Sequence, residues 1–384
     1  MMNRSLAAVR ARHCRGAAAL GFSLVELLVA ITLGLFLVIG LITLLVSNTT
    51  NRTELDKSSR QIENGRYAVQ LLSDDIEHSG FIGSQAQSSF AAPPVVPTAC
   101  PIVTPPDYTP LGYTSATLPA LSSIPLSVYG VAATPACLSH VKLGTARLMV
   151  TRLSTTALTA AGAAGTGETY VQFSNCPDTA TDSTQLVIAG DAGPFPLHEK
   201  DCVTKTPLRK VIQRIYFVAD CNVCTGAGAD TTPTLKVAEY SGGANVVTPL
   251  VEGIENLQFD YGIDMNNGGA PGCYVSDPAS PQAAEILPSR CPQTTPTAYV
   301  WTNAAANWQN VVAVRIHVLA RNAEQSGGWK DGRTYDMGLP VPGIVDSNGQ
   351  ATTGTVGASN DGYKRHVYSA VARLYNVSGQ RELQ

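Results

Sequence analysis

The chain has 384 residues, of which 14% are charged and 7% are aromatic, and it contains 34 Gly and 24 Pro. This composition favours β-structure with many turns over a helical enzyme core. Four of the 26 basic residues lie in residues 1–21, which contain no acid, so residues 22–384 hold 22 basic and 29 acidic residues, a formal charge of −7. A chain this acidic is a poor general binder of nucleic acid or anionic lipid.

A long apolar segment follows the basic leader. Residues 22–46 contain a single charged residue, Glu26. As a helix with a rise of ~1.5 Å per residue, this segment would cross a hydrocarbon core of ~30 Å. The arginines before it would keep the short N-terminal piece in the cytoplasm. A secretory signal would be shorter and followed by a small-residue cleavage site, whereas a plain membrane anchor remains an alternative.

Glu26 argues against a plain anchor. A carboxylate inside a bilayer costs about 2.5–3.5 kcal/mol, so this side chain needs a proton or a partner. Cleavage between Gly21 and Phe22 would create an amine at Phe22, close enough in sequence to lie at the same membrane depth. The amine of one subunit could then neutralise the carboxylate of another and set the axial stagger of packed helices.

The segment Gly21–Glu26 (GFSLVE), followed by an apolar helix, resembles the class III leader of type IV prepilins. The resemblance implies that residues 1–21 are a leader removed by prepilin peptidase, which cuts between Gly21 and Phe22. It also implies N-methylation of Phe22 and a role for Glu26 as the carboxylate that directs assembly.

The helix is expected to continue beyond the membrane, so that residues 22–46 form its transmembrane half and residues 47–80 a periplasmic, amphipathic half. Residues 47–79 contain no proline, and Gly80 is a natural stop. Apolar residues recur at helical spacing, which predicts one face packed against the protein's own head. Gly65 is expected to weaken the helix by ~1 kcal/mol relative to Ala and to allow a bend. The predicted apolar stripe comprises Leu55, Ile62, Val69, Leu72 and Ile76.

Residues 81–140 hold ten prolines and one charged residue, Asp107. This tract predicts extended, loop-rich chain, either a variable surface that contacts a partner or an insertion loop without a particular role. Residues 141–384 are predicted to form a β-rich head. One long helix followed mostly by strands predicts an α+β fold, with a pilin-like N-terminal helix packed on a mainly antiparallel, loop-rich head. The predicted strands are residues 147–153, 211–218, 235–240, 257–261, 311–319 and 366–375.

Nine cysteines are present, and Cys14 lies in the leader. The other eight follow the apolar segment, which predicts an oxidising compartment and up to four disulfides. The sequence does not choose among the 105 pairings. Pairing of sequence neighbours is a plausible hypothesis, because a covalent tie helps where little core exists to hold a loop. The candidates are Cys100, Cys137, Cys176, Cys202, Cys221, Cys224, Cys273 and Cys291.

Cys221 and Cys224 form a C-x-x-C pair, which we interpret as a structural disulfide. A redox pair would precede a helix start, but a glycine-rich stretch follows here. A zinc site would need two further ligands, for which His198 and Cys202 are the nearest candidates in sequence. We expect no metal and no cofactor, and the absence of a nucleophile elbow, a phosphate loop and paired catalytic carboxylates argues against an enzyme.

Two further features have a structural and a functional interpretation. His317 lies in a predicted strand, and we interpret it as a core or surface residue rather than a catalytic base. The best basic cluster lacks regularly interleaved aromatic residues, so a solvated strand face is favoured over contact with DNA. This cluster comprises Lys205, Arg209, Lys210 and Arg214.

Several segments resemble the PilW family of type IV pilus minor pilins. Residues 63–72 (ENGRYAVQLL) resemble the family's signature after the membrane helix, and residues 251–264 (VEGIENLQFDYGID) resemble its central motif. Residues 312–316 and 371–376 also fit the family. We recognise no similarity to the family in residues 82–140 and 266–306.

The resemblance implies a minor pilin that primes assembly of a type IV pilus and is carried to its tip. Its partners would be other minor pilins, the major pilin, prepilin peptidase and the inner-membrane assembly platform, often with a large tip adhesin. The protein would lie in the inner membrane with its head in the periplasm, and then in the extracellular pilus. Twitching motility, adhesion and DNA uptake usually depend on such complexes. The alternatives are a type II secretion minor pseudopilin and a membrane-anchored adhesin or DNA-binding module.

Overall fold

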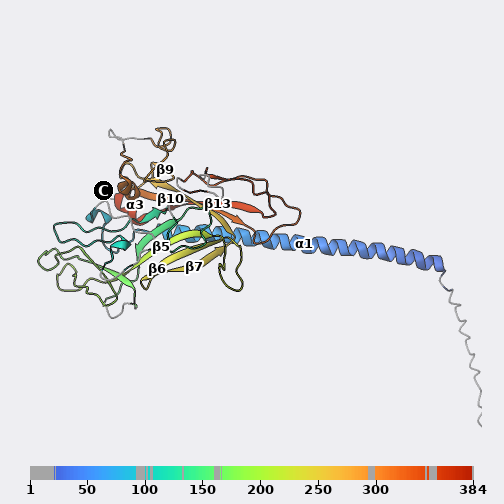
Figure 1. Cartoon of the computed structure of the whole chain (residues 1–384), viewed down its shortest axis with the longest axis horizontal. Coiled ribbons are helices and arrows are strands. Elements are labelled where there is room, and N and C mark those ends of the chain that lie inside the picture. The colour runs from blue at the N-terminus through green and yellow to red at the C-terminus, as the bar shows by residue number, and fades with distance from the viewer. Residues whose placement is uncertain are drawn as a thin grey trace, which may run out of the picture. The chain divides into compact units, whose positions relative to one another are not determined.

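A computed structural model (Figure 1) describes residues 21, 23–91, 100, 103, 107–131, 134–159, 165, 167–292, 299–341, 344–345 and 353–382. The chain divides into two units, Met1–Asp56 and Lys57–Gln384. Helix α1 (Leu24–Glu77) supplies residues to both units. Residues 1–20, which belong to the predicted leader and include Cys14, and also Phe22 lie outside the described residues.

Helix α1 ends where the sequence predicts a stop. The helix contains no proline, and Gly80 follows it with a φ of 70°, a conformation that glycine adopts without a steric penalty. The Gly80 N–H donates to the carbonyl of Thr151, 2.9 Å away. The Asn376 side-chain amide donates to the carbonyls of His78 and Ser79. The bonds from Asn376 satisfy carbonyls of the kind that the C-terminal end of a helix leaves unpaired.

The buried face of α1 differs from the predicted apolar stripe. Leu72 and Ile76 are fully buried as predicted, but Leu55 and Ile62 are 67% and 41% exposed. The prediction was wrong at these two positions because the face that contacts the head includes small and polar residues, which an apolar pattern does not detect. The buried residues of α1 are Gln61, Gly65, Ala68, Leu72, Asp75 and Ile76.

Two of these residues show why the contact excludes larger apolar side chains. The Gln61 amide donates to the carbonyls of Ala320 and Lys364, at 2.8 and 3.0 Å. A Cβ atom at Gly65 would lie 2.2 Å from Cε2 of Tyr368. Helix α1 runs through residue 65 without interruption, so this glycine serves the close approach of the tyrosine ring.

The first sheet of the head has seven antiparallel strands that branch at β5. One edge of β5 pairs with β2, and its other edge is shared by β3 and β6. The long β5 therefore connects the path β1-β2-β5-β3-β4 with the hairpin of β6 and β7. The strands are β1 (Val128–Gly130), β2 (Leu148–Leu153), β3 (Thr169–Phe173), β4 (Leu186–Gly190), β5 (Arg209–Ala219), β6 (Thr234–Ser241) and β7 (Ala244–Glu252).

The second sheet has the order β13-β10-β8-β9, and all of its pairs are antiparallel. A short hairpin of β11 and β12 is separate from it. The strands are β8 (Ile254–Ile263), β9 (Cys273–Val275), β10 (Val311–Arg321), β11 (Tyr335–Asp336), β12 (Thr355–Val356) and β13 (Arg365–Arg373). The remaining helices are the short turns η1 (Gln87–Ser89) and η2 (Thr109–Leu111) and the α-helices α2 (Ala304–Gln309) and α3 (Tyr375–Glu382).

The C-terminal part of α1 lies between the two sheets, with β5, β6 and β7 on one side and β10 and β13 on the other (Figure 1). Ala68, Leu72 and Ile76 belong to one apolar core with Leu148 of the first sheet and Phe259 of the second. Burial of this face is the main reason that the helix is stable within the head, because most helical stability in proteins comes from packing. The predicted α+β class with an antiparallel, strand-rich head is confirmed.

All six predicted strands are present as β2, β5, β6, β8, β10 and β13. The last one ends at Arg373 rather than at residue 375, because helix α3 begins at Tyr375. The loop-rich tract of residues 81–140 contains only β1 and two single turns among its described residues. It nevertheless supplies buried side chains such as Leu111, Tyr113 and Leu126, so part of it belongs to the core of the head.

Gly253 connects the two sheets, because β7 ends at Glu252 and β8 begins at Ile254. Its φ is 76°, and a Cβ atom there would lie 2.8 Å from the carbonyl oxygen of Arg321. The Gly253 carbonyl accepts a hydrogen bond from the Arg321 N–H at 2.8 Å. Only glycine combines this backbone conformation with so close an approach of a neighbouring strand.

This geometry predicts that Gly253→Ala is more destabilising than Gly243→Ala. Gly243 has a φ of 80°, but no atom lies within 4 Å of the place that a Cβ atom would take there, so its substitution incurs only the backbone penalty of about 1–2 kcal/mol. Gly253→Ala must also displace a backbone carbonyl, which should cost at least about 1 kcal/mol more. Denaturant unfolding of the two variants measures the difference, and equal losses would contradict the close contact.

Candidate assembly site

Helix α1 begins with a reciprocal pair of hydrogen bonds between Ser23 and Glu26. The Glu26 N–H donates to Oγ of Ser23 at 3.2 Å, and the Ser23 N–H donates to Oε2 of Glu26 at 3.0 Å. This arrangement is a capping box, and it fixes Ser23 as the N-cap. The sequence contains its signal, S-x-x-E before an apolar run, and Glu26 therefore has a role in the helix cap in addition to the role predicted from its charge.

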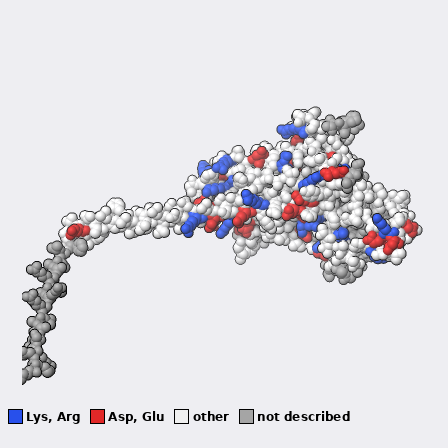
Figure 2. All heavy atoms as spheres, turned by 180° about the vertical axis from the view of Figure 1, so that it is seen from behind, with Lys and Arg blue, Asp and Glu red and all other residues white. Residues whose placement is uncertain are grey.

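The first half of α1 exposes apolar side chains on all sides. Leu24 and Phe36, for example, are 75% and 74% exposed. Among the described residues, α1 is the one helix that is long and apolar enough to cross a membrane, and none of its most apolar window is buried within the protein. Figure 2 shows almost no charge along this part of the helix, whereas charges of both signs are interspersed over the head. Such a surface requires lipid or other helices around it.

The polar side chains of this half are satisfied within the helix. The Thr32 hydroxyl donates to the carbonyl of Val29, and the Thr43 hydroxyl donates to those of Ile39 and Gly40. Glu26 is the one charged residue of the apolar segment, and within the described part of the chain no cation pairs with it. The charge of Glu26 is therefore the main unfavourable contribution to the free energy of transferring this segment to lipid.

Within the head, Asp75 joins α1 to the first sheet. Oδ1 of Asp75 accepts hydrogen bonds from Nε of Arg152 at 3.0 Å and from a terminal nitrogen of Arg214 at 3.1 Å. Oδ2 accepts a hydrogen bond from the Tyr216 hydroxyl at 2.8 Å. Arg214 also pairs with Glu239 at 2.7 Å, directly opposite it on β6. We call these five residues the Asp75 cluster.

The electrostatics of the Asp75 cluster are balanced by direct pairing. Burial opposes the charge of Arg214, but Asp75 and Glu239 outweigh it, so that the pKa of Arg214 is raised. Burial, followed by the nearby charge of Asp75, raises the pKa of Tyr216. Both residues therefore keep their protons at physiological pH, and the Tyr216 hydroxyl serves as a donor to Asp75. The cluster borders an open groove that is also lined by Tyr67 of α1.

The central motif at residues 251–264 is part of a polar ladder across the second sheet. Asp260 is 1% exposed and accepts hydrogen bonds from Arg315 at 3.3 Å and from the Leu339 N–H at 2.9 Å. His317 lies 3.2 Å from Asp260 through Nε2 and 2.9 Å from the Ser369 hydroxyl through Nδ1. His317 and Ser369 are direct cross-strand neighbours, so this arrangement follows from strand register and supports the interpretation of His317 as a strand residue.

A second polar group of this sheet surrounds Arg365. This buried side chain pairs with Glu255 of the central motif, with Asp331 and with Asp361. Burial opposes its charge, but Asp361 and Glu255 outweigh it, so that the pKa of Arg365 is raised. The Tyr335 hydroxyl donates to Asp331. The motif residues Glu255 and Asp260 thus connect strands and loops of the second sheet through ion pairs and hydrogen bonds.

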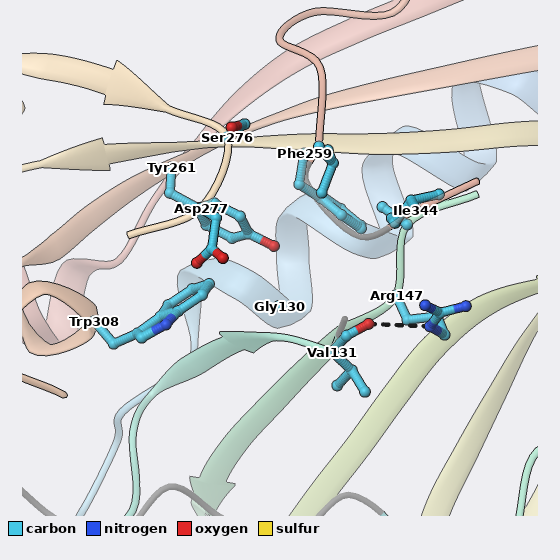
Figure 3. Close-up of a pocket in the computed structure, with 11 residues that line it drawn as sticks. Gly130, Val131, Arg147, Phe259, Tyr261, Ser276, Asp277, Trp308 and Ile344 are labelled. Carbon is cyan, nitrogen blue, oxygen red and sulfur yellow. Dashed lines mark hydrogen bonds between the residues drawn. The ribbon is translucent and has the colours of Figure 1, made fainter. Parts of the chain in front are cut away.

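A small cavity lies between the two sheets (Figure 3). Asp277 points between Tyr261 and Trp308, and across the cavity Arg147 donates to the Val131 carbonyl at 3.0 Å. Burial raises the pKa of Asp277, and a perturbed acid in a cavity is a usual candidate for catalysis. The cavity measures only about 20 Å³, however, which is room for one water molecule rather than for a substrate.

The side chains of the basic cluster form hydrogen bonds or ion pairs within the head. Arg209 donates to the carbonyls of Ser154 and Thr155, and Lys210 pairs with Glu168 at 2.7 Å. Lys205 donates to the Pro196 carbonyl, and Arg214 belongs to the Asp75 cluster. Their charges are engaged within the fold, which favours the structural interpretation over contact with DNA.

The described residues include four disulfides, and each joins two cysteines with no other cysteine between them in the sequence. The Cys273–Cys291 and Cys176–Cys202 bonds tie loops at the second and the first sheet, and Cys100–Cys137 spans much of the proline-rich tract. The bonds are Cys100–Cys137, Cys176–Cys202, Cys221–Cys224 and Cys273–Cys291.

The additional zinc ligands considered for the C-x-x-C pair have other partners. Cys202 is bonded to Cys176, and Nδ1 of His198 lies 2.7 Å from Asp182. The neighbours of Cys221 and Cys224 are instead His140 and Asp220. Sequence spacing could not identify His140, because it reaches the pair through an isolated bridge between Val141 and Ala219.

Comparison with known proteins agrees with these features. The family model described as type IV pilus-assembly protein W, PilW, matches residues 215–376, which run from β5 into α3. The resemblance to the PilW family is thereby confirmed over this range, and it supports a pilin role related to a type IV pilus. A membrane-capable helix at the N-terminus fits a membrane-anchored location for such a protein.

Among solved structures, the chain is similar to a type IV-like pilin from Thermus thermophilus, with 14% identity and a TM-score of 0.26. The alignment covers 63% of this chain and 86% of that chain. No curated protein matches the chain.

The Asp75 cluster predicts that Asp75→Ala destabilises the head by about 3 kcal/mol, because it leaves two arginines and a tyrosine without their shared acceptor. Asp74→Ala is the matched control, since the neighbouring Asp74 is less buried and its loss should change stability by less than about 0.5 kcal/mol. Thermal or denaturant unfolding measures both variants. Similar stabilities for the two would show that the cluster contributes little.

Proposed function

We propose that this protein is a minor pilin that primes assembly of a type IV pilus and occupies its tip. Residues 1–21 are the leader, cut from the chain by prepilin peptidase between Gly21 and Phe22, whose amine is then methylated. Residues 22–46 anchor the protein in the inner membrane, and the head lies in the periplasm before export. It acts as a structural protein and not as an enzyme.

The observation that carries this proposal is the combination of two independent parts of the chain. The family match covers residues 215–376 of the head and does not include α1. Outside the match, α1 presents an apolar surface that is long enough to cross a membrane. The helix begins with the capping box that Glu26 forms with Ser23. The head resembles a pilus-assembly protein, and the exposed apolar helix needs lipid or other helices around it. Both features are expected of a subunit that polymerises through its N-terminal helix.

Glu26 has two separable roles in this proposal. Its side chain accepts the Ser23 N–H in the isolated chain, which requires only an acceptor. Assembly, in contrast, would require its charge, because the amine of a neighbouring processed subunit is the partner that makes the carboxylate tolerable in lipid. Glutamine is also accepted at this position of a capping box, so the two roles respond differently to substitution.

We therefore predict that Glu26→Gln lowers the number of surface pili at least tenfold in cells, without lowering the amount of membrane-inserted protein. Ser23→Ala removes the cap at a cost of about 1 kcal/mol but keeps the charge, and should leave piliation near the wild-type level. Electron microscopy of pili and immunoblotting of membrane fractions measure both quantities.

The opposite pattern, normal piliation with Glu26→Gln and a loss with Ser23→Ala, would show that Glu26 matters only as a helix cap. Loss of the Glu26→Gln protein itself would point to a role in insertion instead. The major pilin should remain in the membrane of the Glu26→Gln strain, because initiation and not subunit supply would be affected. The partners of this protein in initiation would be other minor pilins and the assembly platform, with an adhesin above the pilus tip.

A further inference from the structure

We propose that the Cys221–Cys224 pair, once reduced, forms a binding site for a thiophilic divalent cation such as Zn²⁺ together with His140 and Asp220. The four side chains offer two sulfurs, one imidazole nitrogen and one carboxylate oxygen, and these atoms all lie within 4.8 Å of one another. Two thiolates, a histidine and a carboxylate are ligands that Zn²⁺ accepts in a tetrahedral site.

The ligand atoms lie near the separations of a tetrahedral site: the widest, up to 4.8 Å, must shorten by about 1 Å, and the two sulfurs must move apart. Oδ1 of Asp220 lies 3.1 Å from Sγ of Cys221 and 3.6 Å from Nδ1 of His140. Zinc bonds of about 2.0–2.3 Å place tetrahedral ligand atoms roughly 3.3–3.8 Å apart. In the disulfide the two sulfurs are bonded to each other, so reduction is what separates them and makes both available.

The backbone holds the two non-sulfur ligands side by side. The Asp220 N–H donates to the His140 carbonyl at 2.9 Å, and the bridge between Val141 and Ala219 adjoins this bond. The loop after Cys221 is held by Asp230, which accepts hydrogen bonds from the Asn222 and Val223 N–H groups at 2.8 Å. These bonds do not involve the disulfide, so the loop keeps its anchors when the disulfide opens.

Lys236 supplies the charge that such a site needs around it. A Zn²⁺ ion with two thiolates, one carboxylate and a neutral imidazole carries a net charge of −1. The buried Lys236 ammonium donates to Sγ of Cys224 at 3.2 Å and to the Asn222 carbonyl at 2.9 Å. A donor to a ligating sulfur both compensates this charge and orients the ligand. His140 and Asp220 are exposed, which gives the ion a path from solvent.

The chemistry balances with a dithiol as the reductant. Two electrons and two protons pass from the dithiol to the disulfide, the S–S bond breaks, and the reductant becomes a disulfide itself. Binding of Zn²⁺ then displaces the two thiol protons into solvent. Thiol–disulfide exchange with a second disulfide as the oxidant would reverse the process: the Cys221–Cys224 bond forms again, the oxidant becomes a dithiol, and the ion is released.

The test is alkylation of the full-length protein in detergent micelles after reduction with dithiothreitol, with and without added Zn²⁺. Peptide mapping by mass spectrometry then reports each of the four cysteine pairs separately. Zinc should slow alkylation of Cys221 and Cys224 at least tenfold and leave the other three pairs unchanged. One zinc ion per chain should remain bound after desalting.

Variants separate this site from binding by the two thiols alone. His140→Ala and Asp220→Ala should each weaken zinc binding and the protection of both cysteines at least tenfold, whereas Asp191→Ala, a change in an acid outside the group, should not. The Cys176→Ser/Cys202→Ser variant should keep the bound zinc. Protection that is equal for all pairs, absent from Cys221 and Cys224, or unaffected by the loss of both His140 and Asp220 would overturn the proposal.

Discussion

Helix α1 has to satisfy two different environments along its length, and the rest of the structure is organised by that constraint. From Leu24 to Val46 its side chains are exposed and almost entirely apolar, and its threonines bond to their own helix. From Gln61 to Ile76 one face is buried between two sheets, where polar groups such as Gln61 and Asp75 find defined partners. The first half therefore needs lipid or other helices, and the second half needs this particular head.

The head is built to receive that second half of the helix. Its two sheets share one apolar core with Ala68, Leu72 and Ile76, and Gly253 allows the chain to pass from one sheet to the other. The central motif that resembles the PilW family includes this glycine and four acids, of which Glu255 and Asp260 form ion pairs within the second sheet. The central motif thus belongs to the part of the head that packs around the helix.

The sequence predicted the elements whose signals are local. A long apolar run, a glycine stop and alternating β-branched residues are enough to predict α1 and the six main strands. The buried face of α1 was predicted only in part, because Gln61, Gly65 and Asp75 are buried by tertiary partners that no periodic pattern contains. Short strands such as β1 and β9, with three residues each, and the approach of His140 to Cys221 depend on the same long-range contacts.

The central claim is that processing frees an amine beside Glu26, and the mass of the intact protein recovered from sheared pili tests it most directly. We expect a chain that begins at Phe22, heavier by the ~14 Da methyl group that the family resemblance implies, with its eight remaining cysteines present as four disulfides. A protein that still carries its arginine-containing leader, or that begins at another residue, would contradict this claim.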